Sequence, residues 1–149
     1  GDDTFVIAAG DAGITGVEAI TDFEIALASD TLDLSTTTLF ADAAAANVNA
    51  AVAGAVDVTA TIKNGIISIG GADAGLVDTI GELKAIFELL DTDNTAEAAA
   101  IVMNGHTYVI TDAASGGGAD TVNDIIQLSG VTTATAMSAT DAANSIFIA

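Results

Sequence analysis

Acidic residues dominate the charge of this chain. It carries 21 Asp and Glu against two Lys and no Arg, which gives 149 residues a formal net charge of −19. A compact fold with this charge repels itself, so we expect cations to offset part of it. The chain lacks the basic residues that neutralise phosphates, and an anionic membrane surface would repel it. We therefore expect no nucleic-acid binding and no membrane insertion.

The apolar content is nevertheless high enough for a folded core, since 51% of the residues are hydrophobic. The absence of Cys excludes disulfides and thiolate metal sites. The longest small-apolar stretch, residues 41–58, is interrupted by Asp and Asn and is too weakly apolar to sit in lipid. The length fits one domain or one piece of a repeat protein. Because the chain begins with Gly, we expect a fragment or a processed product.

Short β-rich runs alternate with turn residues along most of the chain. Two hairpins are predicted where Asn-Gly pairs separate apolar runs, over residues 59–69 and 98–110. An Ala-rich helix is predicted near residues 42–53, with Asp42 as its cap, and a second over residues 79–90. In the second, four apolar residues share one helical face: Leu83, Ile86, Phe87 and Leu90. Further strands are predicted at residues 4–7, 18–23, 30–35, 121–128 and 145–149.

The amino end carries a calcium-type motif. Residues 1–5, GDDTF, fit the last half of the nonapeptide G-G-x-G-x-D-x-U-x, with Asp3 at the aspartate and Phe5 at the large apolar position. In such a turn the glycines permit a tight bend, and the Asp side chain and the turn carbonyls ligate Ca²⁺.

Residues 20–23 (ITDF) and 30–35 (DTLDLS) resemble the segment that follows these repeats in RTX proteins, the type I-secreted family that includes serralysin-type proteases. Residues 104–109, 120–122 and 126–132 resemble the C-terminal regions of bacterial RTX surface and S-layer proteins. The resemblance implies export through a one-step channel that reads an uncleaved C-terminal signal, and the short hydrophobic tail at residues 145–149 agrees with it.

The resemblance implies two parts. Residues 1–35 would be the end of a calcium-binding β-roll, and residues 36–149 a β-rich C-terminal assembly and secretion domain. The expected fold class is mainly β, the end of a parallel β-roll plus hairpins in a sandwich-like arrangement, with two or three short α-helices. Four carboxylates are the predicted Ca²⁺ ligands: Asp3, Asp22, Asp30 and Asp33. The alternative is that these are turn-capping residues hydrogen-bonded to backbone.

Other acidic clusters point less clearly to a metal. Residues 91–95 begin like an EF-hand loop, but Ala96 and Val102 replace its Gly and its final Glu, so a polar loop after a helix is favoured. Asp112, Asp120 and Asp124 flank a triple-glycine loop at residues 116–118, and we expect solvated turns there.

Catalytic signatures are missing from the sequence. His106 is the single histidine and is expected as an exposed turn residue. There is no H-E-x-x-H and no G-x-S-x-G. One Tyr and no Trp argue against a carbohydrate-active site. We therefore expect no enzymatic activity.

The expected function is a non-catalytic, calcium-dependent structural module of a secreted bacterial surface protein: an S-layer subunit, an extracellular filament subunit or an adhesin. It would act in type I secretion, folding and self-association into a lattice or filament, through unpaired β edges at the termini. One alternative is the C-terminal calcium-binding and secretion domain of a secreted protease or lipase whose catalytic domain lies upstream. Another is the acidic, calcium-indifferent fold of a halophile.

Overall fold

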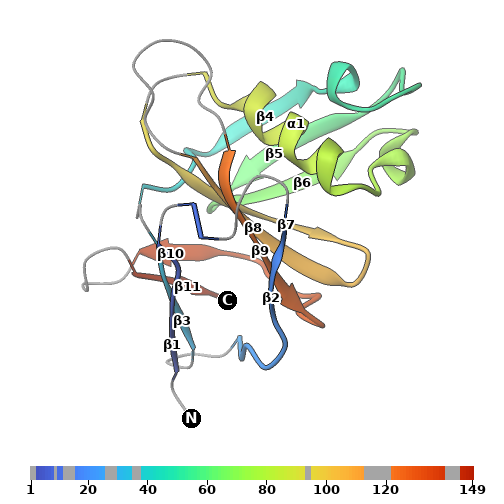
Figure 1. Cartoon of the computed structure of the whole chain (residues 1–149). Helices are drawn as coiled ribbons and strands as arrows, with labels where there is room; N and C mark the ends of the chain where they lie inside the picture. The colour runs from blue at the N-terminus through green and yellow to red at the C-terminus, as the bar shows by residue number, and fades with distance from the viewer. Residues whose placement is uncertain are drawn as a thin grey trace.

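The computed structural model describes residues 3–8, 10–11, 16–25, 30–34, 38–92, 95–112, 122–139 and 145–149. These residues form two β-sheets and an α-helix (Figure 1). The smaller sheet has the order β1-β3-β11-β10, and the larger one β2-β9-β8-β7-β6-β5-β4. The strands are β1 (Thr4–Val6), β2 (Glu18–Ile20), β3 (Thr31–Asp33), β4 (Ala43–Asn47), β5 (Thr59–Lys63), β6 (Ile66–Gly70), β7 (Ala98–Met103), β8 (His106–Asp112), β9 (Val122–Ser129), β10 (Met137–Ala139) and β11 (Ser145–Ile148). The predicted mainly β class is confirmed.

Two apolar cores lie on the two faces of the larger sheet. On one face, strand residues such as Ile67 and Ile101 pack with Leu83 and Phe87 of α1 (Ile80–Leu90). On the other face, strand residues pack with Leu32 and Ile146 of the smaller sheet. The sheet-on-sheet contact gives the fold its sandwich-like part.

The first 35 residues contribute strands to both sheets. β1 pairs in parallel with β3, and β3 continues antiparallel to β11. Between them in sequence, β2 joins the larger sheet, in parallel with β9. β2 and β3 therefore pair with strands near the carboxyl end, and the predicted parallel β-roll is not confirmed.

Both predicted hairpins are confirmed. β5 and β6 flank Asn64-Gly65, and β7 and β8 flank Asn104-Gly105. Asn64 and Gly65 have φ of 51° and 74°, and Asn104 and Gly105 have φ of 52° and 80°. Positive φ at both central residues is what a two-residue turn of this kind requires, and Asn-Gly tolerates it best.

The predicted helix over residues 79–90 is confirmed as α1. Thr79 is its N-cap, and the Thr79 hydroxyl and the Glu82 carboxylate form a reciprocal capping box. Leu83, Ile86 and Phe87 are buried, and Leu90 packs partly buried against the same core. The Phe87 ring stacks on Phe40 with 4.6 Å between centroids.

The predicted helix near residues 42–53 is wrong. This segment forms β4 and a single turn of 3-10 helix, η1 (Asn49–Ala51). Its alanines offer no apolar stripe for a helix, whereas the β5 edge offers backbone partners to Ala43, Ala46 and Asn47. Asp42, the expected helix cap, instead accepts a hydrogen bond from the backbone N–H of Asn64 at 2.6 Å.

The described part of the chain holds no helix with the length and apolar character needed to cross a membrane.

A second 3-10 turn, η2 (Ala74–Leu76), connects β6 to α1.

Two carboxylates fix the loops at the far end of the β5–β6 hairpin. Asp73 accepts hydrogen bonds from the backbone N–H groups of Val56 and Asp57, at 2.9 and 3.0 Å. Asp57 accepts one from Ala72 at 2.9 Å. Gly71 begins the loop after β6 and has φ of 97°. A Cβ on Gly71 would stand 2.1 Å from the carbonyl oxygen of Asp57 in the facing loop.

We predict that Gly71→Ala is among the most damaging single-methyl additions in this chain. The substitution combines strain at positive φ with a backbone clash, and we expect a loss of at least about 3 kcal/mol in the free energy of unfolding, measured by urea denaturation. Gly54→Ala is the matched control, because Gly54 has φ of 79° but no neighbouring heavy atom within 4 Å of the place its Cβ would take. It should lose about 1 kcal/mol. Equal losses in the two variants would contradict the role of the Asp57 contact.

Candidate functional site

Asp30 joins the segments at the amino end of the chain. Its side chain is buried, with 2% of the residue exposed. One carboxylate oxygen accepts a hydrogen bond from the backbone N–H of Asp3 at 3.0 Å, and the other accepts one from Glu24 at 2.8 Å. The backbone N–H of Thr31 donates in return to the Asp3 carbonyl oxygen at 2.9 Å. Asp30 thereby connects the start of β1, the start of β3 and the segment after β2.

The Glu24 N–H, followed by the Asp3 N–H, holds the pKa of the Asp30 carboxyl below its ordinary value of 3.8, against the opposing effect of burial. The two donors stabilise the ionised form. Asp30 therefore shows the turn-capping role that was the alternative to metal ligation.

The four predicted calcium ligands are only partly brought together. Asp3 and Asp30 flank the same end of the β1–β3 pair, because Thr4 stands opposite Thr31. Asp33 lies three residues after Asp30 in the chain, and the rise of a strand places the two residues about 10 Å apart. Asp22 is exposed and follows β2, which belongs to the other sheet. Gly1 and Asp2 of the motif lie outside the described residues.

Within the residues that the structure describes, no group of three or more His, Asp or Glu is arranged to hold a metal ion. The calcium ligands named from the sequence thus stay a prediction. Their side chains differ in access to solvent, since Asp3 and Asp22 are exposed and Asp33 is half-buried.

Asp112 and Asp124 correct the expectation of solvated turns. Both are almost completely buried, with 0% and 1% exposed, near the paired ends of β8 and β9. Asp124 accepts hydrogen bonds from the backbone N–H of Gly10 at 3.0 Å and from the Thr111 hydroxyl at 3.4 Å. Asp112 accepts one from the backbone N–H of Glu97. Asp120 and the triple-glycine loop lie outside the described residues.

Sequence reasoning missed these two carboxylates because it placed them beside a flexible loop. Their positions at the ends of β-rich runs were the available signal, since Asp112 directly follows the run at residues 108–111 and Asp124 directly precedes Ile125 and Ile126. If β8 continues through Asp112 and β9 includes Asp124, their side chains lie on a face of the sheet that packs against a core and are buried there.

The two remaining candidates have structural partners. Asp91 is buried, and its backbone N–H donates to the Phe87 carbonyl oxygen at 2.9 Å, where α1 ends. Asp93 and Asn94 of the EF-hand-like run lie outside the described residues. His106 is half-buried rather than exposed, and its Nδ1 accepts a hydrogen bond from the Gly130 N–H at 3.0 Å. Its ring meets Tyr108 edge-on.

The comparisons with known proteins identify no relative. No family model, no curated protein and no solved structure matches the chain.

We predict that Asp30→Asn destabilises the protein by about 1–3 kcal/mol at neutral pH, because an amide leaves one of the two backbone donors without its acceptor. The Asp30 pKa is lower in the folded state, so its contribution is complete above the ordinary pKa of 3.8 and is lost as the pH falls through the folded value. The difference in unfolding free energy between the wild type and Asp30→Asn should therefore shrink below about pH 4.

Thermal or urea unfolding from pH 7 down to pH 2 measures this difference. Glu88→Gln is the charge-matched control, because Glu88 makes only a surface ion pair with Lys84 at 3.6 Å and should lose about 0.5 kcal/mol or less. A difference for Asp30→Asn that stays constant down to pH 2 would contradict the ionised carboxylate as its source.

Proposed function

We propose that the chain is a non-catalytic, calcium-dependent structural module of a secreted bacterial surface protein, an S-layer or filament subunit or an adhesin. The observation that carries this proposal is the uncompensated charge. The chain has 21 acidic residues and two lysines, and one of these lysines, Lys84, forms an ion pair with Glu88. Asp30, Asp57 and Asp73 accept hydrogen bonds from backbone N–H groups, which leave the net charge unchanged.

Calcium fits this charge better than a transition metal does. Ca²⁺ takes six to eight oxygen ligands, including backbone carbonyls and waters, and needs no His or Cys. The exposed carboxylates of Asp3 and Asp22 and the half-buried Asp33 lie in the region that resembles the end of an RTX repeat. These three side chains supply oxygen that is only partly used by the fold, whereas both oxygens of Asp30 accept backbone N–H groups.

Calcium would couple folding to export. Where Ca²⁺ is scarce, as inside a cell, the carboxylates repel each other and oppose the compact state. Where Ca²⁺ is abundant, binding to the folded state alone stabilises it by mass action. This order of events suits a chain that crosses a channel unfolded and then folds outside the cell.

Self-association is supported by the strand edges. β1 is an edge strand of the smaller sheet, and its Val6 is 68% exposed. β2 and β4 are the edges of the larger sheet. An exposed edge can pair with another chain, as a lattice or filament requires. The carboxyl-terminal strand differs from our expectation of an edge at each terminus, because β11 lies between β3 and β10.

We predict that Ca²⁺ raises the stability of the chain and that Na⁺ at equal ionic strength does not. At a Ca²⁺ concentration 100 times its dissociation constant, one site adds about 2.7 kcal/mol. Thermal unfolding followed by circular dichroism, in EGTA, in millimolar CaCl₂ and in NaCl of equal ionic strength, measures the effect. Identical melting curves after exhaustive chelation would contradict calcium dependence and favour the halophile alternative.

We further predict that Asp22→Asn and Asp33→Asn each weaken Ca²⁺ binding, measured by isothermal titration calorimetry. Glu18→Gln is the matched control, because it removes one charge from an exposed position of β2 in the same region. If all three variants lose the same small amount of affinity, the effect is general electrostatics, and the proposed ligands are wrong.

A further inference from the structure

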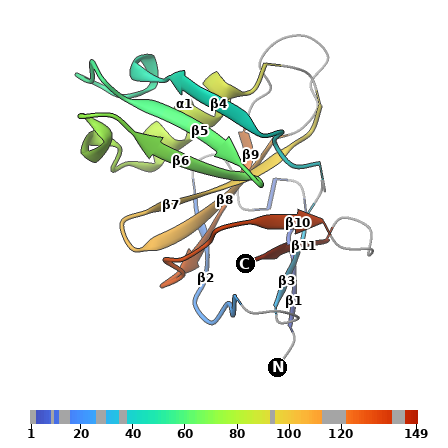
Figure 2. The ribbon, with the colours of Figure 1, turned by 180° about the vertical axis from the view of Figure 1, so that it is seen from behind.

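The larger sheet divides between β6 and β7. The two strands pair in parallel over two residues each, Ile66 with Ala100 and Ile67 with Ile101. β6 nevertheless continues to Gly70 and β7 to Met103. Figure 2 shows the β5–β6 and β7–β8 hairpins diverging beyond this point. We call the opening between Ser68–Gly70 and Val102–Met103 the fork.

The strand backbones direct hydrogen-bonding groups into the fork. Lys63 and Ile66 flank the two-residue turn, so their backbones are hydrogen-bonded to each other. Hydrogen-bonded and non-hydrogen-bonded pairs alternate along an antiparallel ladder, so the next hydrogen-bonded pair is Thr61 with Ser68. The N–H and C=O of Ile69 therefore point away from β5. The Gly65 carbonyl oxygen, on this same side, accepts a hydrogen bond from Ala100 at 2.9 Å. By the same alternation from the Asn104-Gly105 turn, the main chain of Val102 faces β6. Because Ile67 stands opposite Ile101 in the parallel ladder, the Val102 N–H belongs to that pairing, and the Val102 carbonyl oxygen is the group directed into the fork.

A cavity of about 440 Å³ occupies the fork, which is within the usual size range of ligand sites. Its lining includes Ile67 and Met103 from the core beside α1, and Ile66 and Ala134 from the core beside the smaller sheet. Because the lining comes from both faces, the cavity passes between the strands rather than along one face of the sheet.

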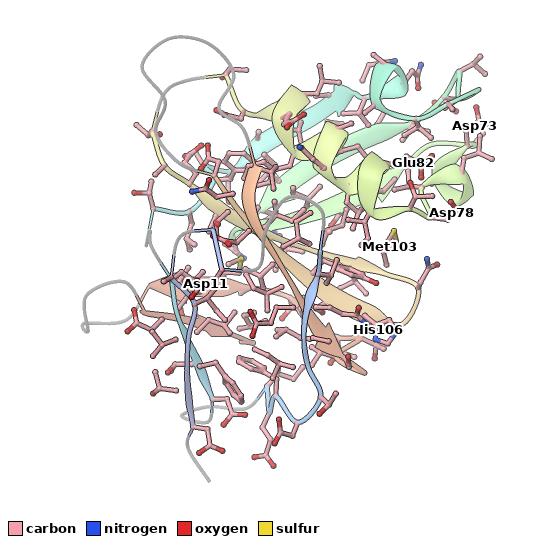
Figure 3. The ribbon with its side chains drawn as sticks, in the orientation of Figure 1. Asp11, Asp73, Asp78, Glu82, Met103 and His106 are labelled. Carbon is pink, nitrogen blue, oxygen red and sulfur yellow. The ribbon has the colours of Figure 1, made fainter. Side chains whose placement is uncertain are left out.

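One acidic residue lines the cavity, and a second accepts a hydrogen bond from its backbone. Asp78 is among its lining residues, and the Asn104 side-chain amide donates to the Asp78 carbonyl oxygen at 3.0 Å, which ties the Asp78 segment to the β7–β8 turn. The Glu82 carboxylate accepts a hydrogen bond from the Asp78 N–H at 3.0 Å. That bond lowers the pKa of Glu82, so its charge persists to low pH. Figure 3 shows Asp78 and Glu82 on the same side of the molecule as Met103. Among the residues that the structure describes, no Lys or His lines the cavity.

We propose that the fork binds an extended, Lys- or Arg-bearing peptide segment of a partner protein, which adds as a strand between β6 and β7. An extended backbone can hydrogen-bond on both of its edges, as the two facing strands require. Its alternating side chains would meet the apolar lining on the two faces of the sheet. A basic residue at its end would meet Asp78. A second copy of this chain fits the fork less well, because its two lysines lie on the internal strand β5 (Lys63) and on α1 (Lys84) rather than on an extended free segment.

The test uses three synthetic peptides of equal length: KVTVTVK, its acidic counterpart EVTVTVE, and KVTPTVK, in which proline removes a donor needed for strand pairing. Binding to the full chain is measured by calorimetry at low salt, with residue-resolved hydrogen exchange of the complex. We expect the basic peptide to bind at least about tenfold more tightly than either of the others. We also expect it to slow the exchange of the Ile69 amide.

Two matched substitutions locate the site. Val102→Lys places a cation at the mouth of the fork and should weaken the basic peptide at least about tenfold. Leu89→Lys is the control on the outer face of α1, with similar exposure of the native residue, 44% against 38% for Val102. It should leave the affinity unchanged. If Val102→Lys fails to fold, Asp78→Asn provides the second test, since it should reduce the advantage of the basic peptide over the acidic one.

Three results would overturn the proposal. The acidic or the proline peptide could bind as tightly as the basic one. The basic peptide could bind without slowing the Ile69 amide. Finally, the Ile69 amide could become protected at high protein concentration without any peptide, together with dimer formation in sedimentation, which would make a second copy the occupant.

Discussion

The hydrogen bond from a backbone N–H to a carboxylate is the interaction on which this fold depends. A chain with two lysines cannot pair most of its acids with basic side chains, so carboxylates such as Asp30 and Asp73 take the backbone donors that every chain has. Asp30 accepts two such bonds, and so does Asp73. Bonds of this charge-assisted kind are stronger than neutral ones, and they satisfy donors at strand ends, turns and the start of α1 that no ladder reaches.

These bonds also hold distant segments together. Asp124 on β9 binds the backbone of Gly10, 114 residues away in sequence, and Asp30 binds that of Asp3, 27 residues away. They support a topology in which β2 and β3 add to strands near the carboxyl end. Such non-local pairings form slowly, and repulsion among the acids opposes them further. A divalent cation that reduces this repulsion would favour the folded state, which is why the calcium proposal and the observed contacts are compatible.

Local signals predicted the local parts of the structure. The Asn-Gly turns at residues 64–65 and 104–105 and the capping box of α1 depend on a few adjacent residues, and each was readable from the sequence. The Ala-rich segment was not, because the β5 edge decided its conformation rather than its own propensity. β10 was missed because only three residues pair with β11 and the run before it consists mostly of Thr and Ala. The candidate site shows the same contrast between local and tertiary signals. Asp30 could be selected from the sequence, but its backbone donors depend on tertiary contacts. The burial of Asp112 and Asp124 depends on tertiary contacts as well.

The most direct test of this account is a residue-specific pH titration of the side-chain carboxyl groups, followed by the ¹³C shifts in NMR. If backbone donors hold the acids in place, Asp30 and Glu82 will titrate below their ordinary pKa values of 3.8 and 4.5. If Asp30, buried as it is, titrates at or above 3.8, then burial dominates over its two donors, and the carboxylate–backbone bonds are not what holds the amino-terminal strands to the rest of the fold.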